Sequence, residues 1–138
     1  HIGIANDIEI NENGLKHPLY KSKNKKFNSP AFNFDEVVKL PEGAVPLASN
    51  KINKIQSIHF KSGISEVWGL QYHPEITYHK MITLINFRKD RLINSRKCFR
   101  NETEIQNHIK FIEDEIKRSV KDARMLELKN WLEYLNAA

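Results

Sequence analysis

An imidazole and a carboxylate stand two positions apart in the run Trp68-Gly69-Leu70-Gln71-Tyr72-His73-Pro74-Glu75-Ile76. Because a residue before proline avoids the α region, the backbone at His73 is predicted to be extended, with the two side chains on the same side. A carboxylate bonded to one ring nitrogen fixes the tautomer and stabilises the imidazolium formed when the other nitrogen takes a proton. The pattern predicts His73 as a general base and Glu75 as its orienting partner; a histidine beside an ordinary loop glutamate is the alternative interpretation of the tripeptide alone.

Two predicted elements position this pair. Residues 54–73 have the pattern of a β-hairpin, with a turn at 61–65 and an apolar return strand at 67–72. A continuous apolar strand of this kind usually lies inside a sheet, and in open α/β sheets the crevice lies beyond the carboxyl ends of the strands. Residues 78–95 carry apolar side chains at helical spacing and predict a helix packed on that sheet.

The remaining elements follow from periodicity and turn residues. Alternating isoleucines predict a half-buried strand at 2–10, ended by a turn at 11–14, and 45–48 predicts a short strand. The polar, lysine-rich composition of 17–29 predicts an exposed loop. Asn101 followed by Glu104 resembles a capping box, which predicts an amphipathic helix from 102, with the apolar stripe Ile105, Ile109, Ile112, Ile116 and Val120. A last helix is expected from about 122, after a bend near 119–123, with the apolar residues Leu126, Leu128, Trp131, Leu132 and Leu135.

Two motifs, about thirty residues apart, carry a family resemblance. Residues 69–75 match the pattern Gly-(Val/Leu)-Gln-(Phe/Tyr)-His-Pro-Glu. Residues 33–50 resemble a segment written His-x-Asp-Glu-Val, then Leu-Pro-x-Gly-Ala, then Leu-Ala-Ser. With these motifs the sequence resembles the class I glutamine amidotransferases, most closely the stand-alone members similar to the glutaminase domain of GMP synthase. Arg124, Glu127 and 130–132 also resemble the terminal helix of some stand-alone members.

The resemblance implies an α/β fold: the carboxy-terminal portion of a flavodoxin-like sheet with a β-hairpin, followed by amphipathic helices. Residues 1–97 are then expected to be the end of the amidotransferase domain, and 98–138 a helical extension packed on it. The implied activity is hydrolysis of glutamine to glutamate and ammonia, for transfer to an acceptor on a synthetase domain or subunit. His73 and Glu75 would be the catalytic residues carried by this chain, and no metal or organic cofactor is implied.

The sequence departs from the family pattern at two points. The family nucleophile is a cysteine in a Gly-x-Cys-x-Gly turn, and the printed sequence contains no such motif. The single cysteine, Cys98, lies past the predicted helix without flanking glycines, so we interpret it as a bystander. The chain is therefore expected to be a fragment, inactive alone, whose missing amino-terminal half supplies the nucleophile, the oxyanion hole and parallel strands. Asn33 stands where the family has histidine, which keeps open the alternative of a non-catalytic regulatory or interaction module.

The composition argues against several other classes of function. The formal net charge of +5 comes from local lysine and arginine clusters without interleaved aromatics, which favours solvated surfaces over a nucleic-acid interface. No apolar run approaches the roughly 20 residues needed to cross a bilayer, and a single cysteine agrees with a reducing compartment, so a cytoplasmic location without a membrane partner is expected. A metal site formed by His73, Glu75 and His79 is a further alternative that no cysteine or acidic cluster supports.

Overall fold

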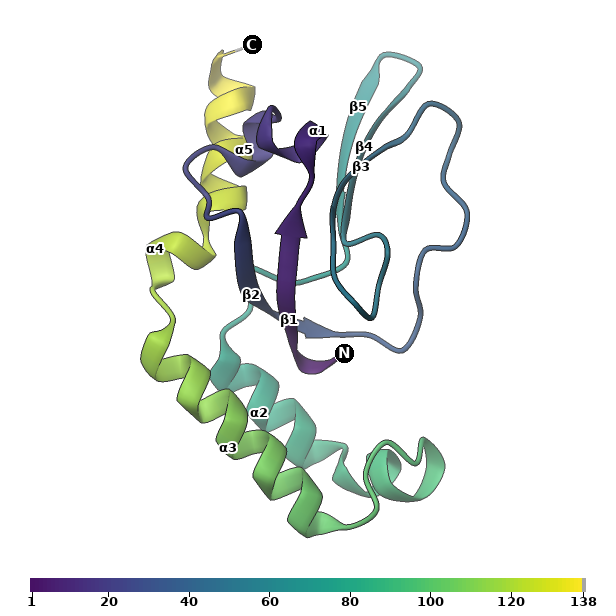
Figure 1. Ribbon diagram of the computed structural model, residues 1–138, viewed down its shortest axis with the longest axis vertical. Helices are drawn as coiled ribbons and strands as arrows, with labels where there is room; N and C mark the ends of the chain where they lie inside the picture. The colour runs from purple at the N-terminus through teal and green to yellow at the C-terminus, as the bar shows by residue number, and fades with distance from the viewer. Residues whose placement is uncertain (138) are drawn as a thin grey trace.

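The computed structural model of the chain describes residues 1–137. Five strands form a curled antiparallel sheet in the order β2-β1-β3-β4-β5 (Figure 1). The strands are β1 (Ile2–Ile10), β2 (Lys26–Phe32), β3 (Val45–Ser49), β4 (Ser57–Ser62) and β5 (Ser65–Leu70). The predicted first strand, the short strand at 45–48 and the hairpin are all confirmed. Every strand pairing within residues 1–137 is antiparallel, so the parallel part of a flavodoxin-like sheet is not among the described residues.

Helices lie at two ends of this sheet. The short ones are α1 (Glu12–Leu15), the 3-10 turn η1 (Pro18–Tyr20), the π-helical turn η2 (Arg91–Ser95) and α4 (Lys121–Arg124). The long ones are α2 (Tyr78–Phe87), α3 (Glu102–Arg118) and α5 (Leu126–Ala137). Figure 1 shows α2 and α3 side by side below the sheet and α5 next to the α1 region at the other end. The helices predicted from 78, 102 and about 122 are confirmed, and the bend between the last two falls at Ser119, which ends α3.

A β-bulge in β1 changes which isoleucines share a face. The pairing with β2 shifts between Ala5 and Ile8, and Asp7 inside the bulge has a positive φ of 51°. One extra residue turns all following side chains to the opposite face. Ile4 therefore packs with α2 and α3, whereas Ile8 and Ile10 pack in the other core cluster. Simple alternation along 2–10 predicted the strand correctly but placed these side chains on one face, which is wrong.

The two core clusters hold the elements around β1. One contains Ile8, Ile10, Leu47 and the tyrosines 20 and 72; the other contains Ile4 with buried residues of α2, η2 and α3. Gly3 permits the second contact, since a Cβ at this position would lie 2.7 Å from Ile112 Cδ1 and 2.9 Å from Ile85 Cδ1. The predicted cap of α3 is confirmed, because Asn101 Oδ1 accepts a hydrogen bond from the Glu104 amide at 3.0 Å.

The apolar return strand of the hairpin lies at the edge of the sheet, so its expected place inside the sheet is wrong. β5 pairs with β4 alone among the described strands. Its apolar side chains are covered on a face instead: Trp68 and Leu70 adjoin Leu128 and Trp131 of α5. Within residues 1–137, α5 and not a second neighbouring strand adjoins this apolar face.

The expected exposed loop at 17–29 is confirmed only at 21–25, and the rest of that range is wrong. His17 begins η1, in which Leu19 and Tyr20 are buried, and β2 already starts at Lys26. The segment at 11–14 likewise ends β1 as predicted but forms the one-turn helix α1, capped by Asn11. The many lysines in the 17–29 segment favoured the prediction of a loop, although its apolar residues Leu19 and Tyr20 enter the core.

Candidate functional site

His73 and Glu75 lie together just past the carboxyl end of β5. The Nδ1 atom of His73 is 2.7 Å from Glu75 Oε1, so the ring and the carboxylate share a hydrogen bond. The side chains are 43% and 48% exposed, which leaves the ring open to solvent. Among residues 1–137 no hydrogen-bond partner occupies the other ring nitrogen, Nε2. The arrangement can therefore hold one tautomer while Nε2 exchanges a proton with a reacting group that approaches from the solvent side.

The backbone of this loop is fixed from two sides. The amide of His73 donates to the carbonyl of Pro30 on β2 at 2.8 Å, and the amide of Ile76 closes a turn onto the carbonyl of His73 at 3.2 Å. On the other side, Arg124 Nη1 donates to the carbonyls of Pro74 and Ile76, the second at 3.1 Å. Thr77 then caps α2 by accepting from the amide of Lys80. The dyad side chains are exposed, but the chain that carries them is held at successive residues.

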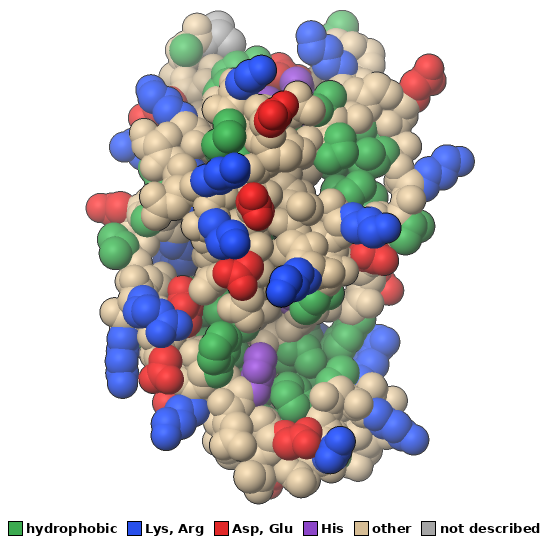
Figure 2. All heavy atoms as spheres, in the orientation of Figure 1, with side chains coloured by type: hydrophobic (Ala, Val, Ile, Leu, Met, Phe, Trp, Pro, Cys, Tyr) green, Lys and Arg blue, Asp and Glu red, His purple; other side chains and the backbone are tan. Residues whose placement is uncertain are grey.

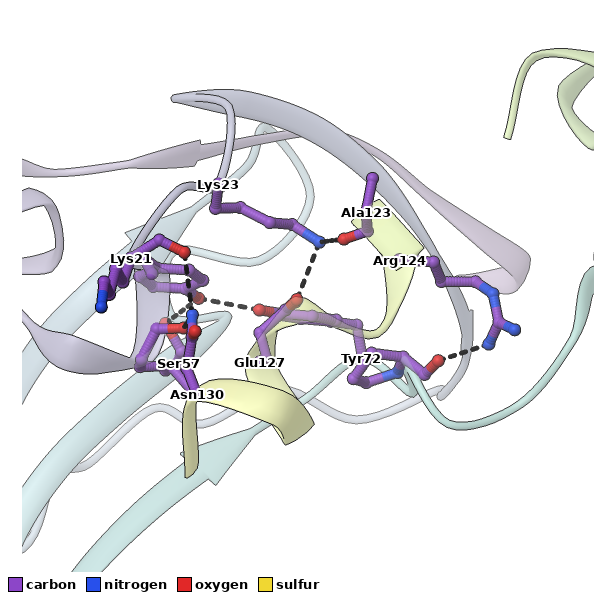
Figure 3. Close-up of polar contacts among 11 residues, drawn as sticks. Lys21, Lys23, Ser57, Tyr72, Ala123, Arg124, Glu127 and Asn130 are labelled. Atoms are coloured by element: carbon purple, nitrogen blue, oxygen red, sulfur yellow. Dashed lines mark hydrogen bonds and ion pairs between the residues drawn. The ribbon is translucent and has the colours of Figure 1, made fainter. Parts of the chain in front are cut away.

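A buried ion pair anchors the helical end of this arrangement (Figure 3). Lys23 Nζ lies 2.7 Å from Glu127 Oε1 and donates to the carbonyl of Ala123 at 2.8 Å. The two charged side chains retain 5% and 1% exposure. Burial lowers the pKa of Lys23, and the charge of Glu127 offsets part of that effect. Asn130 adds two hydrogen bonds, donated to the carbonyls of Leu19 and Lys21.

Hydroxyl groups continue the network toward the dyad. The Tyr20 hydroxyl lies 2.7 Å from Ser57 Oγ and 2.9 Å from the hydroxyl of Tyr72, the residue before His73. Burial raises the pKa of Tyr72 well above its usual value, and the neighbouring Tyr20 and Glu127 raise it further. Both tyrosines are therefore neutral hydrogen-bonding groups at ordinary pH. The residue that precedes the dyad is thus locked in the core.

Cys98 lies away from the dyad. α2 starts five residues after His73 and its helical path continues through η2, and the amide of Cys98 donates to the carbonyl of Leu92 near the far end. At a rise of 1.5 Å per residue, the fourteen steps from Tyr78 to Leu92 span roughly 20 Å. The exposed Sγ atom donates a weak hydrogen bond to the carbonyl of Arg96 at 3.8 Å. This separation agrees with the interpretation of Cys98 as a bystander.

Asn33 and His79 have local roles in the structure. Asn33 follows β2, and its Nδ2 donates to the carbonyl of Asp35 at 2.8 Å. Gln71 donates to the same carbonyl at 3.3 Å, which ties this segment to the strand end that precedes the dyad. His79 is an exposed residue in the first turn of α2. Among residues 1–137, no group of three or more His, Cys, Asp or Glu residues is arranged to hold a metal ion.

A second histidine–glutamate pair lies on the hairpin and was missed in the sequence, where no motif marks it. His59 Nε2 is 2.9 Å from Glu66 Oε1, but the same carboxylate accepts from Tyr134 at 2.8 Å and from Trp68 at 3.3 Å. The ring of His59 also packs edge-on against His17 at a centroid distance of 4.8 Å. Because the Glu66 carboxylate already accepts from Tyr134 of α5 and from Trp68, we assign this pair to packing of the hairpin against α5.

The charged side chains are distributed without a single-signed patch on the face shown in Figure 2, where Lys and Arg alternate with Asp and Glu. Two arginines instead stack on aromatic rings: Arg88 lies over Phe32 and Arg96 over Phe34. Within the described part of the chain, no helix is long and apolar enough to cross a membrane.

Known proteins share part of this sequence. Over 74 residues, 54% of the chain, it is 42% identical to the gamma-glutamyl-L-1-hydroxyisopropylamide hydrolase of a Pseudomonas species, covering 25% of that protein. Over 63 residues, 46% of the chain, it is 33% identical to a glutamine-hydrolysing GMP synthase subunit of Methanocaldococcus jannaschii, covering 32% of that protein. The chain thus spans about a quarter to a third of the length of these relatives. No protein-family model matches the sequence.

These relatives confirm part of the resemblance drawn from the two motifs. The chain is similar to part of an amide hydrolase and to part of a glutamine-hydrolysing synthase subunit, in agreement with that resemblance. The roles of His73 and Glu75 remain predictions.

Proposed function

We propose that this chain supplies the His73–Glu75 pair of a Cys-His-Glu triad that hydrolyses a γ-glutamyl amide, with glutamine as the leading substrate. The observation that carries the proposal is the 2.7 Å hydrogen bond between His73 Nδ1 and Glu75 at an exposed strand end. The names of both relatives support the substrate class, since glutamine and γ-glutamyl-hydroxyisopropylamide are both amides of the γ-carboxyl group of glutamate.

In the proposed reaction, a cysteine thiolate from outside this chain attacks the γ-carbonyl carbon. The imidazolium of His73 gives the proton on Nε2 to the departing amine, the C–N bond breaks, and a thioester remains. Nε2 then takes a proton from a water molecule that attacks the thioester, which releases glutamate and restores the thiolate. Glu75 keeps the proton on Nδ1 and stabilises the imidazolium each time it forms. Backbone amides outside this chain stabilise the oxyanion.

In this proposal the chain is the end of a flavodoxin-like amidotransferase domain, with 1–97 bearing the dyad and 98–138 bracing it. The nucleophile and the oxyanion donors come from residues that precede it in the native polypeptide. Released ammonia passes to an acceptor on a synthetase domain or subunit. Such a transfer depends on the hydrolytic activity, because hydrolysis is the source of the ammonia.

A second candidate function differs in the leaving group. The 42% identity to a γ-glutamyl hydroxyisopropylamide hydrolase favours a substituted amide as substrate, with release of an alkylamine and no transfer of ammonia. The same triad performs both reactions, because only the group on nitrogen changes. Glutamate release from glutamine and from a γ-glutamyl alkylamide, compared by kcat/KM, separates the two.

The deciding experiment measures glutamate release by the native polypeptide that contains this chain. His73→Ala is expected to lower kcat/KM by about 10²–10⁴-fold, the usual contribution of a general acid–base group. His79→Ala is the matched control, since His79 is an exposed histidine six residues away, and its activity should equal the wild type. Full activity in His73→Ala contradicts the proposal. A native polypeptide with no cysteine in the Gly-x-Cys-x-Gly turn, and no activity on either substrate, favours the non-catalytic module.

A further inference from the structure

A single side chain holds the carbonyls on both sides of Glu75. Arg124, the last residue of α4, donates through Nη1 to the carbonyl of Pro74, directly before Glu75, and to the carbonyl of Ile76, directly after it. These contacts join residues 48 and 50 positions apart in the sequence. The Pro74 carbonyl belongs to the peptide plane that enters Glu75, and the Ile76 carbonyl lies one peptide plane beyond the plane that leaves it. The two contacts therefore bracket the backbone of Glu75 and restrict the direction in which the carboxylate leaves it.

The side chains of the dyad contribute little to their own orientation. His73 and Glu75 are each about half exposed, and their side chains contact each other through one hydrogen bond. Solvent competes for both partners of an exposed pair, which makes such a contact weak when it stands alone. The backbone amide of His73 is bonded to Pro30, but that contact lies on the histidine side of the turn. On the glutamate side, the Ile76 amide closes a turn onto the carbonyl of His73 at 3.2 Å, and Arg124 ties the carbonyls of Pro74 and Ile76 to a distant helix.

Arg124 is itself held by buried groups. Its helix α4 is tied to the segment before β2, since Lys23 donates to the carbonyl of Ala123 and pairs with Glu127 at the start of α5. Figure 3 shows Arg124 extending from this network toward the loop, away from Glu127. Lys23 and Arg124 both line a cavity of about 280 Å³ between β2 and α4. The guanidinium of Arg124 thus donates to the two carbonyls, and the Lys23–Glu127 network holds the backbone of α4 from which the side chain extends.

We propose that Arg124 is a positioning residue, which sets the geometry of the His73–Glu75 hydrogen bond by clamping the carbonyls of Pro74 and Ile76. The catalytic consequence rests on the proposed function, whereas the geometric consequence does not. Loss of the clamp frees the backbone segment that carries Glu75 to move, and the carboxylate then leaves Nδ1 for part of the time. A base that is misplaced by about 1 Å can lose as much as 100-fold in rate.

The first test reads the histidine ring directly by ¹⁵N NMR of the labelled protein above neutral pH. In the wild type we expect the tautomer with the proton on Nδ1, because this atom donates to the carboxylate. Arg124→Gln is expected to give a mixture of both tautomers at His73. Arg118→Gln is the matched control: Arg118 on α3 is 62% exposed, and its side chain donates to Glu115 of the same helix. Unchanged α3 amide resonances show that each variant is folded.

Arg124→Lys is the second variant. A lysine keeps the charge but has one nitrogen on a flexible chain, so an intermediate mixture of tautomers is expected. If Arg124→Gln does not fold, the His73 tautomer in Arg124→Lys alone decides whether the proposal holds. Wild-type tautomer in the folded Arg124 variants overturns the proposal.

The second test measures kinetics in the native polypeptide. Arg124→Gln is expected to lower kcat by about 10- to 100-fold with KM changed by less than about threefold, because the base is displaced while substrate binding is retained. Arg118→Gln should match the wild type. If the tautomer changes in Arg124→Gln but the wild-type protein has no amide hydrolase activity, the proposed function is removed and the positioning role remains. An unchanged tautomer together with normal kcat removes the positioning role and leaves the proposed function intact.

Discussion

Lys23 and Glu127 meet 2.7 Å apart in the interior, although 104 residues separate them in the sequence. The pair joins the segment before β2 to the first turn of α5, and almost none of either side chain is exposed. Removing one partner of such a pair leaves a buried charge without compensation, which is more costly than the net contribution of the intact pair. The pair is therefore a point where stability can be tested.

Glu127→Gln is expected to lower the free energy of unfolding by about 3 kcal/mol, because Lys23 keeps its charge in a buried site. Urea unfolding followed by circular dichroism measures the change. Glu9→Gln is the control, since Glu9 pairs with Lys25 at 3.9 Å on the exposed surface, and the expected loss is about 0–1 kcal/mol. Equal midpoints for both variants would contradict the assignment of a buried pair.

Glu75→Gln tests the orienting carboxylate. The amide is close in shape to the carboxylate but cannot stabilise an imidazolium by charge, so glutamate release by the native polypeptide should fall by about 10²-fold or more. The fold should not change, because Glu75 is exposed and its side chain contacts His73. Glu42→Gln, in the exposed turn before β3, is the control. Wild-type rates in Glu75→Gln would exclude the orienting role.

Gly3→Ala tests the close contact between β1 and the two helices below the sheet. Gly3 has a φ of +84°, and the added methyl would meet Ile112 Cδ1 and Ile85 Cδ1 below 3.0 Å. Strain and overpacking together should cost about 2–4 kcal/mol in thermal or urea unfolding. Gly63→Ala has a similar positive φ of 61° but open space around it, so it measures the backbone cost alone, about 1 kcal/mol. The double variant with Ile112→Val, which removes Cδ1, should recover part of the loss.

Alkaline pH should unfold the protein through its buried tyrosines. Burial raises the pKa of Tyr20, Tyr72 and Tyr78 above the ordinary value of 10.0. The unfolded chain then loses these protons first, so stability is complete below about pH 10 and falls as the pH rises, by about 1.4 kcal/mol per pH unit for each tyrosine. The lowered pKa of Lys23 acts in the opposite direction to the tyrosines, and this effect fades above the ordinary lysine pKa of 10.5, where the unfolded chain also loses the proton.

Tyr78→Phe isolates one of these contributions. Among residues 1–137 the buried Tyr78 hydroxyl has no hydrogen-bond partner, so its removal should leave stability at neutral pH equal or slightly higher. The slope of unfolding free energy between about pH 11 and 12 should become shallower by about 1.4 kcal/mol per pH unit. Urea titrations at a series of pH values measure both quantities. A slope equal to that of the wild type would show that Tyr78 titrates equally in the folded and unfolded states.

The elements that sequence reasoning found are those with local signals. Period-two alternation marked β1 and the hairpin, and the Asn101 cap with its isoleucine stripe marked α3. The proximity of His73 and Glu75 was also accessible, because Pro74 restricts the chain between them. The residues that make up each of these signals lie close together in the sequence, within one strand, one hairpin or one helix.

The elements that were missed depend on distant partners. The lysine-rich segment at 17–29 has the composition of an exposed loop, but the charge of Lys23 finds its partner on α5, out of reach of any local pattern. The apolar residues of α5 suggested its buried face, yet Glu127 and Asn130 are buried, while Trp131, Leu132 and Leu135 remain half exposed. Arg124 resembled a family residue, but its contacts with Pro74 and Ile76 follow from tertiary structure alone.

The long sequence separation of the Arg124 and Asn130 contacts affects the order in which the protein can assemble during translation. Contacts spanning 48 to 111 residues close large loops, and such closures form late compared with hairpins and helices. On a ribosome, the β1–β2 pair and the β4–β5 hairpin can each form long before residues 124–130 have been synthesised. The histidine and glutamate would thus remain unclamped in the nascent chain, and the finished geometry would arrive only with the final helices.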